Sequence, residues 1–149
     1  MLWPIVGSAS DWPAYRKEQA HIDAGESPAW DLGDREALTI VAPWHGVVKE
    51  SASDPHVDDG RFHAGNITIL QIDYNGVAYE IHFCHQQALE CLQGAQLDRG
   101  DVIGHVGHTG PGLTGSGQKI PLADAHLHLW VRKSMNGLWQ RVWPSELFG

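Results

Sequence analysis

The chain is organised around one segment, Ala125-His126-Leu127-His128-Leu129-Trp130-Val131, in which imidazoles alternate with leucines. Side chains alternate between the two faces of a β-strand, so His126 and His128 are expected on one face, roughly 6 to 7 Å apart. Leu127 and Leu129 then point from the other face into a core. Paired imidazoles suit a metal ion such as zinc, although a solvated polar face explains a lone His-x-His equally well. The other motifs of the chain have to distinguish these two interpretations.

The composition indicates a globular chain that can bury a substantial core. Its 149 residues are 42% hydrophobic and 19% charged, which predicts one domain covering residues 1–149. The formal net charge is -8, and no run of Lys or Arg forms a basic stripe. We therefore expect neither nucleic acid nor an anionic membrane surface as the main partner.

No targeting or membrane segment is evident. Residues 1–7 lack a basic stretch followed by an apolar run, so no signal peptide is expected. No stretch approaches the ~18 apolar residues of a membrane span. The two cysteines, Cys84 and Cys91, are too few for a disulfide scaffold and lack the Cys-x-x-Cys spacing of a zinc knuckle. Their redox state, the export route and the oligomeric state stay open.

Frequent glycines and prolines divide the chain into short apolar runs, which predicts a mostly β fold with little helix. The clearest hairpin joins strands at 66–73 and 78–84 through Asn75-Gly76, because Asn-Gly favours a tight β-turn. Further strands are expected at 38–43, at 47–50, within 97–107, at 125–131 and, after an Asn136-Gly137 turn, at 139–143. One helical turn is expected around residues 14–20, and an acidic surface loop at residues 51–60.

The chain contains ten histidines, more than a core needs. Hydrolytic zinc sites use three protein ligands and leave a fourth position to water, whose pKa falls to about 7. One or two histidines outside the ligand set can move protons or stabilise an oxyanion. The histidines are therefore candidate ligands and candidate catalytic groups.

Several motifs form a recognisable order along nearly the whole chain. They are Trp3–Gly7, Val41–Val48, Gly65–Ile69, Asn75–His85, Gly100–Gly110, His126–Leu129 and Asn136–Pro144. Taken together, they are similar to the lysostaphin-type zinc endopeptidases, which cut peptide cross-links in bacterial cell walls. The resemblance implies an antiparallel β fold of barrel-sandwich type, with a groove and a single zinc ion at its floor.

The resemblance also implies site residues. In that family a His-x-x-x-Asp pair provides two zinc ligands and the second His of His-x-His provides the third, which implies Asp31 and His128. The first His of His-x-His and a His that ends an aromatic-x-His strand act in catalysis, which implies His126 and His85. One of these two would be the general base and the other the oxyanion stabiliser, in an order that the sequence leaves open.

One position departs from the family pattern. Ser27 stands four residues before Asp31, where the family has its first His, and a hydroxyl is a poor zinc ligand. His21 is the preferred replacement, because the Gly- and Pro-containing segment between it and Asp31 can fold back. Glu26 is the second choice, since a carboxylate also binds zinc. If neither side chain reaches the site, two ligands remain and zinc affinity is weak or absent.

The resemblance therefore implies a zinc-dependent endopeptidase that hydrolyses peptide bonds of bacterial cell-wall peptidoglycan through a metal-activated water, outside the cytoplasm. The alternative is a catalytically inactive relative that binds wall peptide or a partner amidase, and Ser27 is its main support. A lipoyl- or biotinyl-like carrier is a further hypothesis, but the hairpin tip at Asn75-Gly76 lacks the lysine that it needs. A cupin-type barrel also contains His-x-His, but the order of the other motifs does not fit.

Overall fold

Antiparallel strands dominate this computed structural model, which describes residues 1–6, 18–33, 35–54, 64–110 and 120–149. The strands are β1 (Ile5–Val6), β2 (Trp30–Leu32), β3 (Thr39–Val41), β4 (Gly46–Asp54), β5 (Gly65–Tyr74), β6 (Val77–Gln86), β7 (Gln96–Leu97), β8 (Val102–His105), β9 (Leu127–Met135) and β10 (Leu138–Val142). The helices are α2 (Glu18–Asp23), the 3-10 helix η1 (Leu122–Asp124) and α3 (Ser145–Phe148). The predicted fold class, mostly antiparallel β with little helix, is confirmed.

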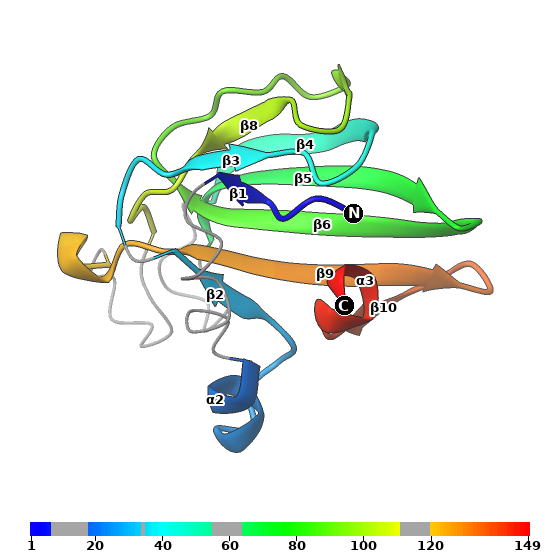
Figure 1. The fold of residues 1–149 in the computed structure, drawn as a ribbon, viewed down its shortest axis with the longest axis horizontal. Helices are drawn as coiled ribbons and strands as arrows, with labels where there is room; N and C mark the ends of the chain where they lie inside the picture. The colour runs from blue at the N-terminus through cyan, green and yellow to red at the C-terminus, as the bar shows by residue number, and fades with distance from the viewer. Residues whose placement is uncertain (7–17, 34, 55–63, 111–119) are drawn as a thin grey trace.

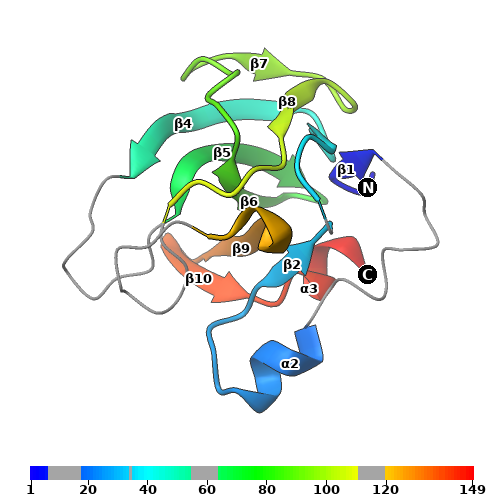
Figure 2. The ribbon, with the colours of Figure 1, turned by 90° about the vertical axis from the view of Figure 1, so that its left-hand side faces the viewer.

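The strands form two sheets that share one core. The larger sheet has the order β10-β9-β6-β5-β4-β7, with β2 paired to β9 as well, and the smaller one has the order β1-β3-β8. Figures 1 and 2 show the small sheet beside the β4, β5 and β6 part of the large sheet, while α2 projects next to β2. Ile5 and Ile40 of the small sheet belong to the same buried cluster as Leu70 and Phe83 of the large sheet.

Strand β9 follows the alternation expected from the sequence. Its apolar residues Leu127, Leu129 and Val131 are completely buried in the core. Neighbouring side chains on a strand point to opposite faces, so His128 and Trp130 belong to the outer face of the sheet. The outer face of β9 therefore carries the polar chemistry, and the inner face holds the strand in place.

Both predicted Asn-Gly turns are present. Asn75 and Gly76 have φ angles of 53° and 75°, and Asn136 and Gly137 have φ angles of 51° and 80°. Two successive residues with positive φ are characteristic of type I′ turns, which match the twist of the strands that they join. The hairpins β5–β6 and β9–β10 are therefore confirmed.

Other predicted boundaries shift. Strand β4 continues to Asp54 and pairs with β5, so the loop predicted for 51–60 was wrong in its first part, and 55–60 lie outside the described residues. Polar side chains on a solvent-facing strand resemble a loop in composition, which explains the error. Helix α2 spans Glu18–Asp23, later than the turn predicted around 14–20, of which 14–17 are not described.

Among the described residues, no helix has the length and apolar character needed to cross a membrane.

The two ends of the described chain pack on β2. Trp3 stacks on Trp30 with ring centroids 5.5 Å apart and on Phe148 at 6.3 Å. Trp30 has no exposed surface. Burying an aromatic ring of this size contributes several times the free energy of a single surface contact. The packing therefore anchors the short strand that carries Asp31.

Candidate functional site

Asp31 and His128 meet through the pairing of two strands. β2 is antiparallel to β9, and Asp31 lies directly opposite His128 in the register. Directly opposed residues project from the same face of a sheet. The Asp31 Oδ1 and His128 Nδ1 atoms are 2.9 Å apart, although the residues are separated by 97 positions in the sequence. Pairing of β2 with β9 therefore provides the centre of the site.

His21 completes a group of three ligand-type side chains. Its Nε2 atom lies 3.4 Å from Asp31 Oδ2, and its ring centroid lies 5.9 Å from that of His128. One nitrogen or oxygen atom from each of the three residues falls within 4.8 Å of the other two. Ser27 is exposed and contributes no atom to this group. Of the residues weighed as a replacement for the missing His, His21 is the one that the fold brings to Asp31.

Glu26 contacts the other side of the His21 ring. The Gly25 amide donates to Ile22 O (3.0 Å) and the Glu26 amide donates to His21 O (2.9 Å), with Gly25 at φ 68°. This is the Schellman arrangement that ends many helices, and it brings the second residue after the helix end beside the last full turn. The Glu26 carboxylate consequently contacts His21 Nδ1 and is not part of the three-residue group.

The hydrogen bond to Glu26 determines the proton position on His21. A carboxylate only accepts, so Nδ1 donates to Glu26 and Nε2 keeps its lone pair in the neutral ring. His21 is 5% exposed, and its Nε2 atom is buried without a hydrogen-bond partner. A buried nitrogen lone pair without a donor is costly unless something outside the protein binds it. The residues present thus fit a divalent cation of the zinc type.

The two expected catalytic histidines lie next to this group. The His85 ring centroid is 5.2 Å from that of His126 and 6.0 Å from that of His128. His126 Nδ1 donates to Asp124 O at 2.7 Å, while Nε2 lies 3.6 Å from Asp31 Oδ1. All five residues expected from the sequence are therefore gathered at one place.

A β-bulge turns His85 toward the site. In a regular strand His85 would share the inner face with Phe83, which is completely buried in the core. Instead the pairing of β5 with β6 shifts register between Asn66 and Thr68, and His85 has a φ angle of 63°. Bulges and positive φ angles re-aim side chains near functional sites. His82 stacks on Trp130 on the outer face and lies outside the group.

Thr109 holds the bulge, and the sequence analysis assigned it no role. Its carbonyl oxygen accepts from His85 Nδ1 at 2.8 Å, and its hydroxyl donates to Gln86 O at 2.7 Å. The same hydroxyl accepts from the Asn66 amide at 3.0 Å. A Cβ at Gly65 would lie 2.4 Å from the carbonyl carbon of Thr109, so only glycine permits this approach. The sequence signal was the Thr109-Gly110 pair in the family pattern, which implied no contact with His85.

The surroundings of the site keep Asp31 ionised and His85 and His128 neutral. Burial opposes ionisation of Asp31, but the His128 hydrogen bond and the charges of His126, His128 and His21 outweigh it and place its pKa well below the usual range. Burial lowers the pKa of His85 to about 3, helped by His126 and His128. Burial also lowers the pKa of His128. Neutral imidazoles and a carboxylate are the protonation states that bind a metal ion.

The remaining described histidines have partners elsewhere. His105 Nδ1 lies 2.7 Å from a Glu90 carboxylate oxygen, and His108 Nε2 lies 3.0 Å from Glu36. His45 is exposed. His56 and His63 fall outside the described residues.

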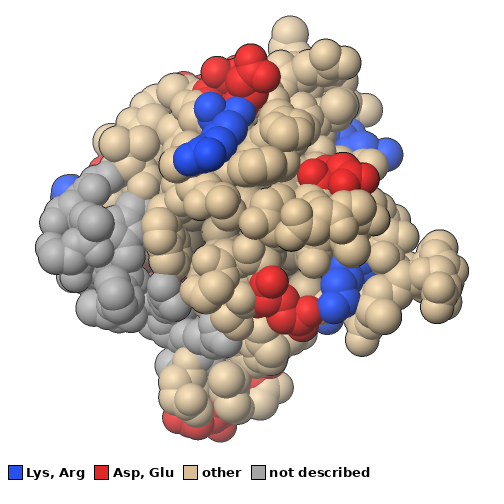
Figure 3. All heavy atoms as spheres, turned by 45° about the vertical axis from the view of Figure 1, so that its right-hand side comes forward, with Lys and Arg blue, Asp and Glu red and all other residues tan. Residues whose placement is uncertain are grey.

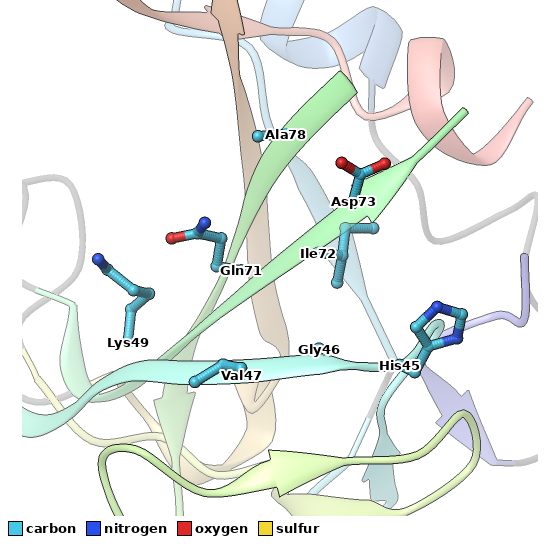
Figure 4. A pocket seen from close by; sticks show the side chains of 8 residues that line it. All are labelled: His45, Gly46, Val47, Lys49, Gln71, Ile72, Asp73 and Ala78. Atoms are coloured by element: carbon cyan, nitrogen blue, oxygen red, sulfur yellow. The ribbon is translucent and has the colours of Figure 1, made fainter. Parts of the chain in front are cut away.

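The protein also has an open hollow of about 430 Å³ (Figure 4). It is lined by His45, Gly46, Val47, Lys49, Gln71, Ile72, Asp73 and Ala78. None of the five site residues lines it. On the face shown in Figure 3, Lys and Arg lie near Asp and Glu in small separate groups, without one dominant charged patch.

Comparisons with known proteins relate the chain to solved peptidase structures. No protein-family model and no curated protein matches the sequence. The catalytic domain of the antimicrobial peptidase lysostaphin from Staphylococcus simulans superposes with a TM-score of 0.57 and 20% identity, covering 84% of this chain and 80% of that one. The catalytic domain of EnpA, a prophage-encoded M23 protein from Enterococcus faecalis that was solved as a point mutant, gives 0.57 and 19%, covering 81% and 78%.

A third neighbour is described as zinc-containing. This peptidase from Vibrio cholerae gives a TM-score of 0.53 and 22% identity, covering 76% of this chain and 28% of that one. At identities near 20%, similarity to a solved structure shows a shared fold, and all three neighbours share the same fold. The chain therefore has the fold of lysostaphin-type M23 peptidases.

Proposed function

We propose that this protein is a zinc-dependent endopeptidase that hydrolyses peptide bonds of bacterial cell-wall peptidoglycan. The observation that carries the proposal is the meeting of His21, Asp31 and His128, with His85 and His126 beside them. The fold, shared with structures named as peptidases, supports the same reaction class. Residues 1–149 would act as one domain, outside the cytoplasm, on a wall peptide.

His21, Asp31 and His128 would hold the ion. Two imidazoles and one carboxylate form a ligand set common in hydrolytic zinc sites, where a fourth position is left to water. Bound zinc would lower the pKa of that water and polarise the carbonyl of the scissile bond. Glu26 would orient His21 as an outer carboxylate partner, in the way that such partners fix the ring and the proton of metal-binding histidines.

His85 is suited to accept a proton. Its Nδ1–H is committed to Thr109 O, so Nε2 carries the lone pair and faces the other site histidines. Burial lowers the pKa of His85 to about 3, so the ring is neutral at neutral pH and Nε2 carries no proton. A pKa this low makes the ring a weak base, so its role as acceptor would depend on its position beside the site and not on its basicity. We therefore assign His85 the role of general base.

His126 is suited to donate to a developing oxyanion. Its Nδ1–H donates to Asp124 O, which fixes the ring, and its Nε2 atom lies 3.6 Å from the Asp31 carboxylate. In this role an Nε2–H of His126 would donate to the carbonyl oxygen of the scissile bond. Donors placed in advance at such a position stabilise the charge that forms there.

Zinc stoichiometry and wall cleavage together test the proposal. Wild type should retain about one zinc after dialysis and release peptides from purified peptidoglycan. His21→Ala and His128→Ala should lose both properties. His105→Ala is the matched control, because His105 pairs with Glu90 away from the site and should keep both. Wild type that takes up no zinc would refute the endopeptidase, and sedimentation with cell walls would then test the inactive wall-binding alternative.

A further inference from the structure

Three side chains form a stack on the outer face of β6, β9 and β10. His82 lies opposite Trp130 in the strand register, with ring centroids 3.4 Å apart and planes inclined by 16°. The Arg141 guanidinium carbon lies 4.4 Å from the Trp130 ring centroid. Since β6 and β10 flank β9 on its two sides, His82 and Arg141 approach Trp130 from opposite directions. The stack fixes where the guanidinium of Arg141 lies.

Arg141 also binds the segment that joins two residues of the proposed zinc site. Its Nε atom donates to the carbonyl oxygen of Pro28 at 2.8 Å, across 113 positions of sequence. Pro28 stands two residues after Glu26 and three before Asp31. The hydrogen bond thus ties β10 to the chain between His21 and Asp31.

Among the described residues, the chain is held differently on the two sides of Pro28. Asp31 is fixed by the pairing of β2 with β9, and Trp30 is buried. On the other side of Pro28, residues 22–25 and Ser27 are exposed, and Gly25 has a φ angle of 68°. The direction in which the chain leaves β2 therefore determines whether the His21 ring arrives at Asp31.

We propose that Arg141 is a positioning residue for the metal site, with His82 and Trp130 as its support. By holding the Pro28 carbonyl, it directs the chain so that Glu26 and His21 reach Asp31. The inference rests on the proposed zinc site. Side chains that orient ligands from outside a metal site are worth roughly 10- to 100-fold in metal affinity.

Arg132 is a close match that lacks this contact. It lies on the same outer face, its guanidinium carbon is 5.2 Å from the Trp139 ring centroid, and its Nε donates to Glu80 at 2.5 Å. Like Arg141, it is half-buried and stacked on an indole. Unlike Arg141, it makes no hydrogen bond to residues 21–31 in the described part of the chain. Truncating Arg132 removes its stack on Trp139 and its contact with Glu80. Truncating Arg141 removes its stack on Trp130 and the contact with Pro28, so only this change would affect the ligands.

The experiment compares zinc affinity and apo-protein stability in Arg141→Met, Arg141→Lys, Arg132→Met and wild type. Zinc affinity is measured by competition with a chromophoric chelator, and the visible spectrum of bound Co²⁺ reports ligand geometry. We expect Arg141→Met to bind zinc roughly 10- to 100-fold more weakly, with an altered Co²⁺ spectrum. Arg141→Lys should lose less but still more than about threefold, because lysine keeps the charge and a donor but loses the planar stack that places that donor. Arg132→Met should keep wild-type affinity even where its melting temperature falls.

Each outcome decides one question. Affinities within twofold of wild type in both Arg141 variants overturn the positioning role, even if their stability is reduced. If Arg141→Met does not fold, Arg141→Lys decides by the same criterion. A wild-type protein that binds no zinc refutes the zinc site itself, which is a separate failure. Equal weakening in Arg132→Met would also overturn the inference, because it would show a general effect of the sheet face.

Discussion

Asp31 and His128 face each other across paired strands, with a carboxylate oxygen and a ring nitrogen 2.9 Å apart. Strand pairing over backbone hydrogen bonds fixes both residues without help from the side chains themselves. The contact therefore persists when one side chain is changed conservatively. This property makes Asp31 the first position at which to separate metal binding from folding.

We expect Asp31→Asn to fold and to lose zinc. The amide keeps the shape of the carboxylate but removes the negative charge that three histidines surround. Zinc affinity should fall by at least about 100-fold, beyond the usual cost of losing an outer partner. Titration with a competing chelator measures it. Asp73→Asn is the control, because Asp73 is exposed, accepts from the Gly76 amide and lies outside the site. Unchanged affinity in Asp31→Asn would remove Asp31 from the ligand set.

Glu26→Gln should weaken zinc binding less than Asp31→Asn does. The glutamine oxygen can still accept from His21 Nδ1, but it lacks the charge that makes the ring a stronger ligand. A reduction of roughly tenfold is expected in the same titration. Glu90→Gln serves as the control, because Glu90 pairs with His105 outside the site. A loss as complete as in Asp31→Asn would instead indicate that Glu26 is itself a ligand.

The sequence predicted the parts of this site that depend on local pattern. Alternation placed His126 and His128 on one face, and the Asn-Gly turns located two hairpins. The sequence favoured His21 over Glu26 but could not decide between them, because that choice depends on how the chain turns at Gly25 after α2. A three-residue strand such as β2 carries too little pattern to predict, and its pairing with β9 is a long-range event.

The orientation of His85 also lay beyond local pattern. Strand alternation alone would point it inward with Phe83. The bulge exists because Thr109, distant in sequence, approaches Gly65 and bonds to His85 and Gln86. Tertiary contacts of this kind override strand periodicity. The family resemblance supplied His85 as a candidate, but the physical reason for its position came only from the fold.

His85→Gln should abolish cleavage while zinc stays bound. Glutamine is of similar size and can donate to Thr109 O, but its amide is not a base. We expect kcat to fall by roughly 10²- to 10⁴-fold, with zinc affinity close to wild type. Peptide release from purified walls and chelator titration measure the two quantities. If zinc is lost together with activity, His85 belongs to the ligand set, and if activity is retained, it is not the base.

Gly65→Ala should cost more stability than Gly76→Ala. Both glycines have positive φ angles, 63° and 75°, so both substitutions incur a backbone cost of about 1 to 2 kcal/mol. At Gly76 nothing lies within 4 Å of the added Cβ, whereas at Gly65 it meets the Thr109 backbone. Overpacking adds about 1 to 3 kcal/mol at Gly65, which urea unfolding would detect.

The activities of these two variants should diverge further. Displacing Thr109 removes the acceptor that orients His85, so Gly65→Ala should lose cleavage even under conditions where it is folded. Gly76→Ala, at the tip of a hairpin, should cleave like wild type. Equal stability losses in the two variants would mean that Thr109 moves aside without cost.

Acid should destabilise the apo protein through His82. Burial, with smaller contributions from Arg132 and Arg141, lowers the pKa of His82 to about 3, against 6.5 for an unperturbed ring. In the unfolded chain His82 binds a proton below about pH 6.5, whereas in the native protein it binds one only below about pH 3. The contribution of neutral His82 to the free energy of unfolding is therefore fully present above pH 6.5. Between pH 6.5 and pH 3 this contribution falls by about 1.4 kcal/mol per pH unit. Asp31, whose pKa is lowered, loses its contribution only at more acidic pH.

His82→Phe isolates this effect. Phenylalanine can keep the stack on Trp130 and removes the ring nitrogen that lacks a hydrogen-bond partner in the described structure. The free energy of unfolding of the metal-free protein, from urea titrations at pH 7, 6, 5 and 4, should fall less steeply in the variant, by up to about 1.4 kcal/mol per pH unit. Parallel curves for the two proteins would show that His82 becomes protonated in the native state, and that the stack beneath Arg141 tolerates its charge.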